Sequence, residues 1–261
     1  MPVKRLRIFA GPNGSGKSEL YKFLIQQNYF HAYYYINPDE ICKQLLSGFS
    51  VQLWPVTIQK GEFFTFLIKS PINSNASDDI KITEDDFETR IFVNDSVFSC
   101  TDELTQKKKE LLASVVADYL RELMLKSGST FACETVMSHP SKLDFLREAK
   151  ANGYQIYLYF IATKNPVINE ERVKNRVEDG GHDVPPDKIR SRYPKTMDNL
   201  YNAVKLSDKA WIFDNSESME SRSYKNFAIY NASSKEITFL EQTIPNWFQE
   251  YFIDKNQKYL E

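Results

Sequence analysis

The stretch whose residue types most clearly suit chemistry is a glycine-rich segment near the start of the chain. It fits the pattern G-x-x-x-x-G-K-[ST] of the phosphate-binding loop. Its members are Gly11, Pro12, Asn13, Gly14, Ser15, Gly16, Lys17 and Ser18. Such a loop binds nucleotide phosphates through successive backbone N–H groups at a helix N-terminus. Because the lysine reaches the β- and γ-phosphates and the serine hydroxyl binds Mg²⁺, we predict ATP and Mg²⁺ as cofactors.

A carboxylate follows the second predicted strand, at about residues 32–36. In the sequence Asn37-Pro38-Asp39-Glu40, asparagine can cap a helix, proline suits its first position, and acids suit its first turn. Asp39 could accept the proton of an acceptor hydroxyl or bind Mg²⁺ through water. The alternative is that both acids only complement the helix dipole. We favour a functional role for Asp39 and the dipole role for Glu40.

A second acid, Glu134, and the neighbouring Thr135 follow a short apolar strand at 130–133. Small or apolar residues followed by an acid resemble the second motif of P-loop NTPases, in which the carboxylate meets the metal shell or the substrate. We predict that Glu134 is functional, and we consider Thr135 as a residue that hydrogen-bonds the substrate. The alternative is that polar residues simply end the strand.

The polar, arginine-rich segment 166–206 holds the remaining candidates. Arg172 and Arg176 are four residues apart on one predicted helix face, and Arg190 and Arg192 follow a break at 180–186. A lid-like helix pair that brings arginines to a γ-phosphate stabilises the transferring group and excludes water. The alternative is that the arginines pair with nearby acids such as Glu170, Glu171 and Asp187.

Alternating strands and helices must position these groups. Strands are predicted at 5–10, 32–36, 130–133, 154–161 and 210–213, a hairpin at 227–230 and 237–240, and the clearest helices at 103–126 and 245–259. This alternation predicts an α/β fold with a mostly parallel central sheet and helices on both faces. In such sheets the ligand lies beyond the carboxyl ends of the strands, where the candidates were found.

Residues 49–100 interrupt the alternation. The stretch is rich in turn-forming residues and acids, and its aromatic clusters, Phe63–Ile68 and Ile91–Val93, favour short strands that form a hairpin. We interpret it as an edge insertion within one domain that covers residues 1–261. Its acids are typical of a solvated face.

The composition limits the classes of partner. A net charge of −2 gives no signature of polyanion binding, so nucleic acid is not expected as the partner. No segment approaches the ~20 apolar residues of a membrane span, and the first residues do not form a signal peptide. Three widely spaced cysteines predict buried thiols in a reducing compartment, so we expect a cytoplasmic protein.

As a set, these motifs resemble the zeta toxin family of P-loop kinases. The matching segments, which follow one another in order, are 11–18, 36–41, 131–138, 171–177, 180–185, 190–193 and 213–216. The resemblance implies phosphoryl transfer from ATP to a hydroxyl of a small-molecule acceptor, such as a nucleotide sugar. It also implies Asp39 as general base, Glu134 and Thr135 at the acceptor, and phosphate contacts from Arg172, Arg176 or Arg192.

The sequence departs from the family pattern in the spacing of its arginines at 172–192 and in the residues after Asp39. Zeta toxins have an arginine shortly after the catalytic aspartate, whereas Glu40, Ile41, Cys42 and Lys43 follow Asp39 here. We therefore keep two alternatives to a kinase. One is a nucleotide-binding, toxin-like interaction module held by an antitoxin-like protein, and the other is a plain ATPase without a small-molecule acceptor.

Overall fold

In a computed structural model, the chain forms two compact units, Met1–Tyr35 with Thr130–Glu261 and Ile36–Ser129. The structure describes residues 3–31, 34–53, 55–179, 181, 183–217 and 224–259. Two of the five residues of the expected strand 32–36, Ala32 and Tyr33, and two members of the 180–185 motif, Gly180 and His182, therefore lie outside the described residues.

The first unit is built on a seven-stranded sheet with the order β10-β9-β8-β7-β1-β6-β2. Four central strands are parallel, namely β1 (Arg5–Ala10), β6 (Phe131–Thr135), β7 (Gln155–Ala162) and β8 (Lys209–Asp214). Two antiparallel strands, β9 (Lys225–Asn231) and β10 (Glu236–Phe239), extend one side as the predicted hairpin. On the other side, the short β2 (Tyr35–Ile36) lies where the chain passes to the second unit.

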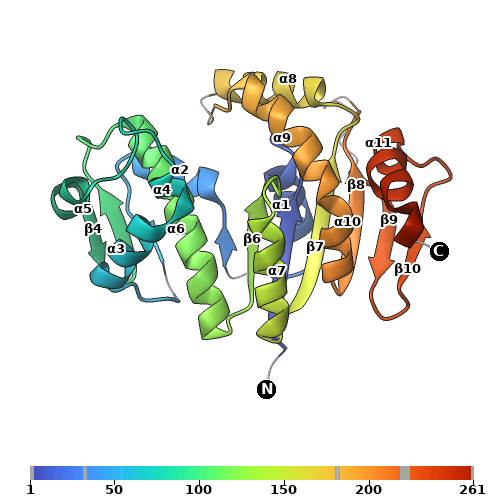
Figure 1. The fold of residues 1–261 in the computed structure, drawn as a ribbon, viewed down its shortest axis with the longest axis horizontal. Coiled ribbons are helices and arrows are strands. Elements are labelled where there is room, and N and C mark those ends of the chain that lie inside the picture. The colour runs from blue at the N-terminus through green and yellow to red at the C-terminus, as the bar shows by residue number, and fades with distance from the viewer. Residues whose placement is uncertain are drawn as a thin grey trace. The chain divides into compact units, whose positions relative to one another are not determined.

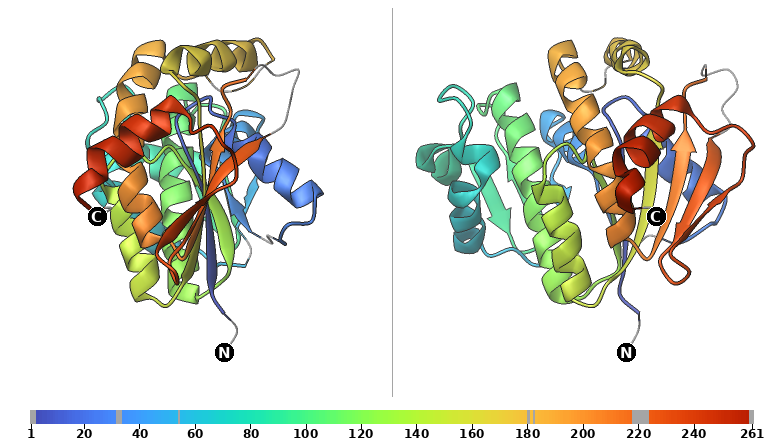
Figure 2. Two further views of the ribbon diagram at one scale, coloured as in Figure 1. Left: turned by 90° about the vertical axis from the view of Figure 1, so that its right-hand side faces the viewer. Right: turned by 45° about the vertical axis from the view of Figure 1, so that its right-hand side comes forward.

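Helices cover both faces of this sheet (Figure 2). Helix α1 (Lys17–Gln26) packs on one face, where Leu20 and Leu24 join Phe9, Tyr159 and other aromatic side chains in a core cluster. Helices α7 (Ser141–Ala151) and α10 (Leu200–Leu206) pack on the other face against β7. The predicted α/β fold with a mostly parallel sheet is therefore confirmed.

The arginine-rich segment forms helices α8 (Pro166–Glu178) and α9 (Pro186–Asp198). They lie at the end of the sheet to which the parallel strands point (Figure 1). The predicted C-terminal helix is present but irregular. It starts as α11 (Asn246–Phe248), continues as a π-helical turn at Gln249–Ile253, and ends in 3₁₀ geometry at Asp254–Tyr259.

The second unit combines helices with a small antiparallel sheet of order β3-β5-β4. Its elements are α2 (Pro38–Leu46), β3 (Val51–Gln52), α3 (Lys60–Lys69), α4 (Pro71–Ser74), α5 (Glu84–Arg90), β4 (Ile91–Asn94), β5 (Val97–Cys100) and α6 (Gln106–Ser127). The strand predicted at Ile91–Val93 is present as β4, but its hairpin partner is β5 and not the segment Phe63–Ile68. The strand predicted over Phe63–Ile68 is wrong, because this segment is helix α3 and buries Phe63 and Leu67, four residues apart, on one face.

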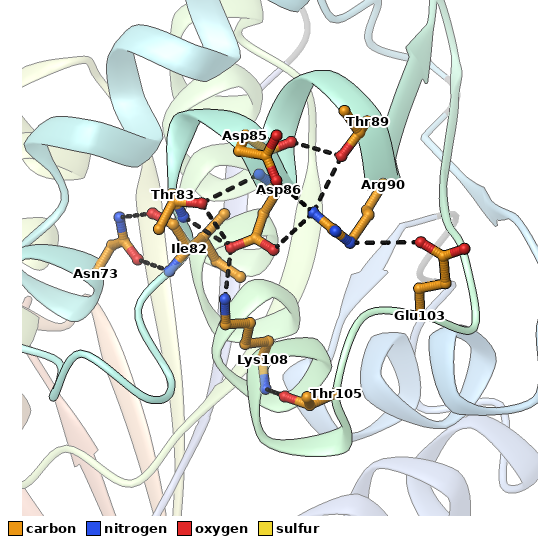
Figure 3. A network of polar contacts seen from close by, with 10 residues as sticks. All are labelled: Asn73, Ile82, Thr83, Asp85, Asp86, Thr89, Arg90, Glu103, Thr105 and Lys108. Atoms are coloured by element: carbon orange, nitrogen blue, oxygen red, sulfur yellow. Dashed lines mark hydrogen bonds and ion pairs between the residues drawn. The ribbon is translucent and has the colours of Figure 1, made fainter.

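A polar network centred on Asp86 fixes the start of α5 (Figure 3). The Asp86 carboxylate accepts from the backbone N–H and hydroxyl of Thr83, while Thr83 Oγ1 accepts from the Asp86 N–H, which completes a capping box. Lys108 of α6 donates to the same carboxylate at 2.6 Å. Within the described residues, no helix combines the length and apolar character needed to cross a bilayer.

Candidate functional site

The glycine-rich segment connects β1 to α1, as predicted, and its conformation requires glycine. At Gly11 and Gly14 the φ angles are 150° and 74°, values that side chains disfavour. A Cβ at Gly11 would lie 2.0 Å from the carbonyl oxygen of Ile161, and one at Gly14 would lie 2.5 Å from that of Asn169. The loop is therefore packed directly against the backbone of β7 and α8.

Two asparagine side chains hold the carbonyl groups of this loop. Asn169 of α8 donates from Nδ2 to the carbonyl of Asn13 at 2.5 Å, and Asn215, just after β8, donates to that of Ser15 at 2.9 Å. A loop whose carbonyls are fixed by side chains keeps its backbone amides preorganised for an anion.

The side chains of the loop fit a triphosphate. Lys17 Nζ donates to the carbonyls of Gly11 and Pro12, at 3.1 and 2.9 Å, so its ammonium group lies at the loop itself. The Ser15 hydroxyl is completely buried, yet no hydrogen-bond partner is found for it in the described part of the chain. A buried hydroxyl without a partner costs about 1–3 kcal/mol, a penalty that a ligand oxygen would remove. Ser18 lies half-buried in the first turn of α1.

Glu134 and Thr135 lie beside the start of the loop. They are the last two residues of β6, and the parallel register aligns them with Phe9 and Ala10 of β1. Glu134 is buried and accepts a hydrogen bond from the hydroxyl of Tyr35. The structure thus brings these two predicted residues to the phosphate loop.

Thr135 has a local structural role as well. Its hydroxyl accepts from the backbone N–H of Met137, whose φ of 60° marks a tight turn after the strand.

The arginines differ in their surroundings. Arg172 is half-buried and donates from one amino group to the carbonyl of Glu217, while its Nη1 is buried without a partner among the described residues. Burial lowers the pKa of Arg172, and the nearby Tyr224 and Asp214 oppose that shift. Arg190 makes a bidentate ion pair with Glu170, at 2.6 and 2.7 Å.

The remaining candidate arginines lie on the same two helices. Arg176 is half-buried on α8, and Arg192 is exposed on α9. For Arg190 the alternative reading, an ion pair with a nearby acid, is the one that the structure shows.

Asp39 belongs to the second unit, where it lies exposed in the first turn of α2. The predicted cap is present, since the Asn37 side chain accepts from the Asp39 backbone N–H at 2.9 Å and Pro38 takes the first helical position. This local geometry positions the carboxylate at the N-terminus of α2.

Sequence reasoning missed two residues that support the loop. Asn215 holds the loop backbone, while the neighbouring Asp214 accepts from Trp247 and Ser216. The contribution of Asn169 was missed because its partner lies 156 residues away.

The chain resembles known proteins in sequence and in fold. The family model for zeta toxin matches residues 65–226. An uncharacterized protein of Haemophilus influenzae is 33% identical over 69 residues, which cover 26% of this chain and 49% of that protein. The chain thus spans about half the length of the curated relative that it matches.

Among solved structures, the complex of AvrRxo1-ORF1 and -ORF2 with ATP is similar over 95% of this chain and 63% of that chain. The TM-score is 0.57 and the identity 12%, which is a likeness of fold. The same complex with sulphate ions gives a TM-score of 0.52 at 14% identity, with 95% and 63% of the two chains covered.

Proposed function

Since the chain belongs to the zeta toxin family, we propose that it is an ATP- and Mg²⁺-dependent kinase that phosphorylates a hydroxyl of a small-molecule acceptor. The observation that carries this proposal is the loop itself. Its carbonyls are held by Asn169 and Asn215, the Lys17 ammonium group donates to two others, and the Ser15 hydroxyl is buried and available to a ligand. Phosphoryl transfer depends mainly on positioning and charge neutralisation, which such a loop supplies.

The residues around the loop would share the remaining tasks. Ser18 would bind Mg²⁺. When bound, this ion neutralises part of the negative charge on the phosphates. In the part of the chain that is described, no three His, Cys, Asp or Glu side chains gather into a metal site. Mg²⁺ usually keeps several waters and takes phosphate oxygens as ligands, so one serine hydroxyl near a triphosphate suits its chemistry.

Acceptor chemistry is assigned to three residues. We propose that Asp39 takes the proton of the attacking hydroxyl, and that Glu134 and Thr135 hydrogen-bond the acceptor. The position of Glu134 beside the loop supports its share of this assignment. A nucleotide sugar is the acceptor class that we favour, on the strength of the family resemblance.

We further propose Arg172 as the arginine that contacts the nucleotide phosphates. Its half-buried guanidinium has an Nη1 that lacks a partner in the described part of the chain, and an anion would satisfy that group. Arg176 and Arg192 remain candidates for the same role. An antitoxin-like protein partner is also proposed, because the chain that shares this fold comes from a complex of AvrRxo1-ORF1 with AvrRxo1-ORF2.

The test is ATP consumption with and without a panel of nucleotide sugars and nucleosides. We expect turnover to depend on one acceptor class, to be lost in Asp39→Asn, and to persist in the neighbouring control Glu40→Gln. Lys17→Ala should weaken ATP binding roughly tenfold to a hundredfold, as expected for loss of a charge-assisted hydrogen bond, whereas Lys22→Ala should not. Lys22 is a suitable control because it is exposed on the same helix, in an ion pair with Glu19.

The outcomes separate the kinase from its alternatives. Hydrolysis at the same rate under every condition would indicate a plain ATPase. Nucleotide binding without any turnover would indicate an interaction module.

A further inference from the structure

Helix α9 is connected to the phosphate loop through a chain of buried hydrogen bonds. Tyr193 of α9 is 4% exposed, and its hydroxyl donates to the carbonyl of Thr163 at 2.5 Å. Burial raises the pKa of Tyr193, so this hydroxyl stays protonated and remains a donor. Thr163 is completely buried and directly follows β7, the central strand next to β1.

Thr163 in turn orients the side chain that holds the loop. Its hydroxyl donates to Oδ1 of Asn169, which is also completely buried. Because an amide that accepts through its oxygen must present its nitrogen elsewhere, Nδ2 of Asn169 is directed to the carbonyl of Asn13. The chain of bonds therefore runs from Tyr193 through Thr163 and Asn169 into the loop.

Backbone packing supports the same connection. The carbonyl oxygen of Asn169 lies so close to Gly14 that a Cβ there would be 2.5 Å from it. Helix α8 thus contacts the loop through the side chain of Asn169 at Asn13 and through its backbone at Gly14.

About one turn after Tyr193, the C-terminal end of α9 is bonded to the turn that follows the strand carrying Glu134. The hydroxyl of Thr196 donates to the carbonyl of Val136 at 2.8 Å, and Nδ2 of Asn199 donates to that of Met137 at 2.8 Å. Both acceptors belong to the turn that follows Glu134 and Thr135. The C-terminal half of α9 and its C-cap Asn199 are therefore bonded to the residues that follow β7 and β6.

Building on the proposed nucleotide-binding function, we propose that Asn169 and Tyr193 are positioning residues that hold the phosphate loop in its binding conformation. Neither residue needs to touch the nucleotide. Asn169 acts on the loop directly, and Tyr193 acts through Thr163 on the orientation of the Asn169 amide. The position of α9, which these hydrogen bonds fix, then determines the affinity for ATP.

The test combines single and double variants in calorimetric titrations with ATP. Loss of a net hydrogen bond, about 0.5–1.5 kcal/mol, predicts that Tyr193→Phe raises the Kd roughly twofold to tenfold, and Asn169→Ala should raise it roughly tenfold or more. If both act through one chain of bonds, adding Tyr193→Phe to Asn169→Ala changes the Kd by less than about twofold. The matched control is Tyr230→Phe, which removes the hydroxyl of another buried tyrosine on β9 and should leave the Kd unchanged.

Hydrogen exchange of the loop provides a readout that needs no nucleotide. The N–H of Ser15 donates to Pro12 at 3.2 Å and that of Leu20 donates to Gly16 at 2.9 Å. We expect both amides to exchange faster in Asn169→Ala and Tyr193→Phe than in the wild type or Tyr230→Phe. If Asn169→Ala fails to fold, Tyr193→Phe and the near-isosteric Asn169→Asp carry the test.

The result that overturns the proposal is specific. Folded variants with wild-type ATP affinity and wild-type exchange at the loop would refute it, and additive effects would refute the connection through Thr163. A wild-type protein that binds no ATP would refute the proposed function instead, and hydrogen exchange would then decide on the positioning role.

Discussion

The ring of Tyr35 lies parallel to that of Tyr21, with 3.6 Å between their centroids and 2° between their planes. Tyr21 belongs to α1, the helix that starts at the phosphate loop, and the hydroxyl of Tyr35 donates to Glu134. Burial raises the pKa of Tyr21, and the negative charge of Glu134 raises it further. The stacked tyrosines therefore connect helix α1 to the Glu134 carboxylate at the end of β6.

This coupling predicts a measurable response of Tyr21. In Glu134→Gln the pKa of Tyr21 should fall, because the carboxylate charge is removed, but it should stay above its ordinary value because burial remains. The measurement is a pH titration of ¹³Cζ-labelled tyrosine by NMR. The control is Glu19→Gln on the same helix, which should leave the pKa of Tyr21 unchanged. An unchanged pKa of Tyr21 in Glu134→Gln would contradict the coupling.

Arg172 and Arg190 form a matched pair of arginines in the lid-like segment. Arg190 is engaged by Glu170, whereas Arg172 presents a buried Nη1 without a partner in the described ranges. We expect Arg172→Ala to weaken ATP binding roughly tenfold to a hundredfold and Arg190→Ala to change it less than about twofold. Equal changes in ATP affinity for the two variants in calorimetric titrations would show that Arg172 does not contact the nucleotide.

Asp86 predicts an acid dependence of stability in the second unit. Burial alone would raise the pKa of this carboxyl, but hydrogen bonds from Lys108 and Thr83 lower it below its ordinary value of 3.8. The ionised form therefore stabilises the fold above the unfolded-state pKa, and this contribution is lost as the pH falls through the lower folded-state pKa.

Asp86→Asn should accordingly lower the free energy of unfolding by about 1–3 kcal/mol at neutral pH. The difference from the wild type should shrink as the pH falls below about 3.8, the ordinary value. Urea unfolding across this range is the measurement. The exposed Asp78→Asn in the same unit should change stability by less than about 0.5 kcal/mol at neutral pH, and a pH-independent loss in Asp86→Asn would contradict the assignment.

Local patterns were sufficient to predict much of the first unit. The phosphate loop is recognisable because its glycines, lysine and serine lie within eight residues. The predicted strand at 154–161 corresponds to β7 at Gln155–Ala162, whose continuous apolar character reflects burial on both faces. The predicted helix 103–126 corresponds to α6, which ends at Gly128 in a left-handed conformation that glycine favours.

The remainder depended on contacts that the local sequence does not encode. A short apolar run such as 63–68 suits a strand or a helix, and the Gln59 side chain makes no capping hydrogen bond to mark the start of α3. Asn169 lies within a helix and Asn215 in a turn, so each has a plausible local role. Only the fold brings their amides to the carbonyls of Asn13 and Ser15.

Close packing at Gly14 can be separated from backbone strain by comparison with Gly153. Their φ angles are 74° and 79°, so an added Cβ strains both backbones similarly, by about 1–2 kcal/mol. At Gly153 nothing lies within 4 Å of that Cβ, whereas at Gly14 it would meet the Asn169 carbonyl at 2.5 Å.

Gly153→Ala should therefore lose only the strain energy and keep wild-type ATP affinity. Gly14→Ala should lose more stability in urea unfolding and bind ATP at least roughly tenfold more weakly, because α8 must shift away from the loop. Equal stability losses with unchanged ATP affinity in both variants would show that α8 does not support the loop.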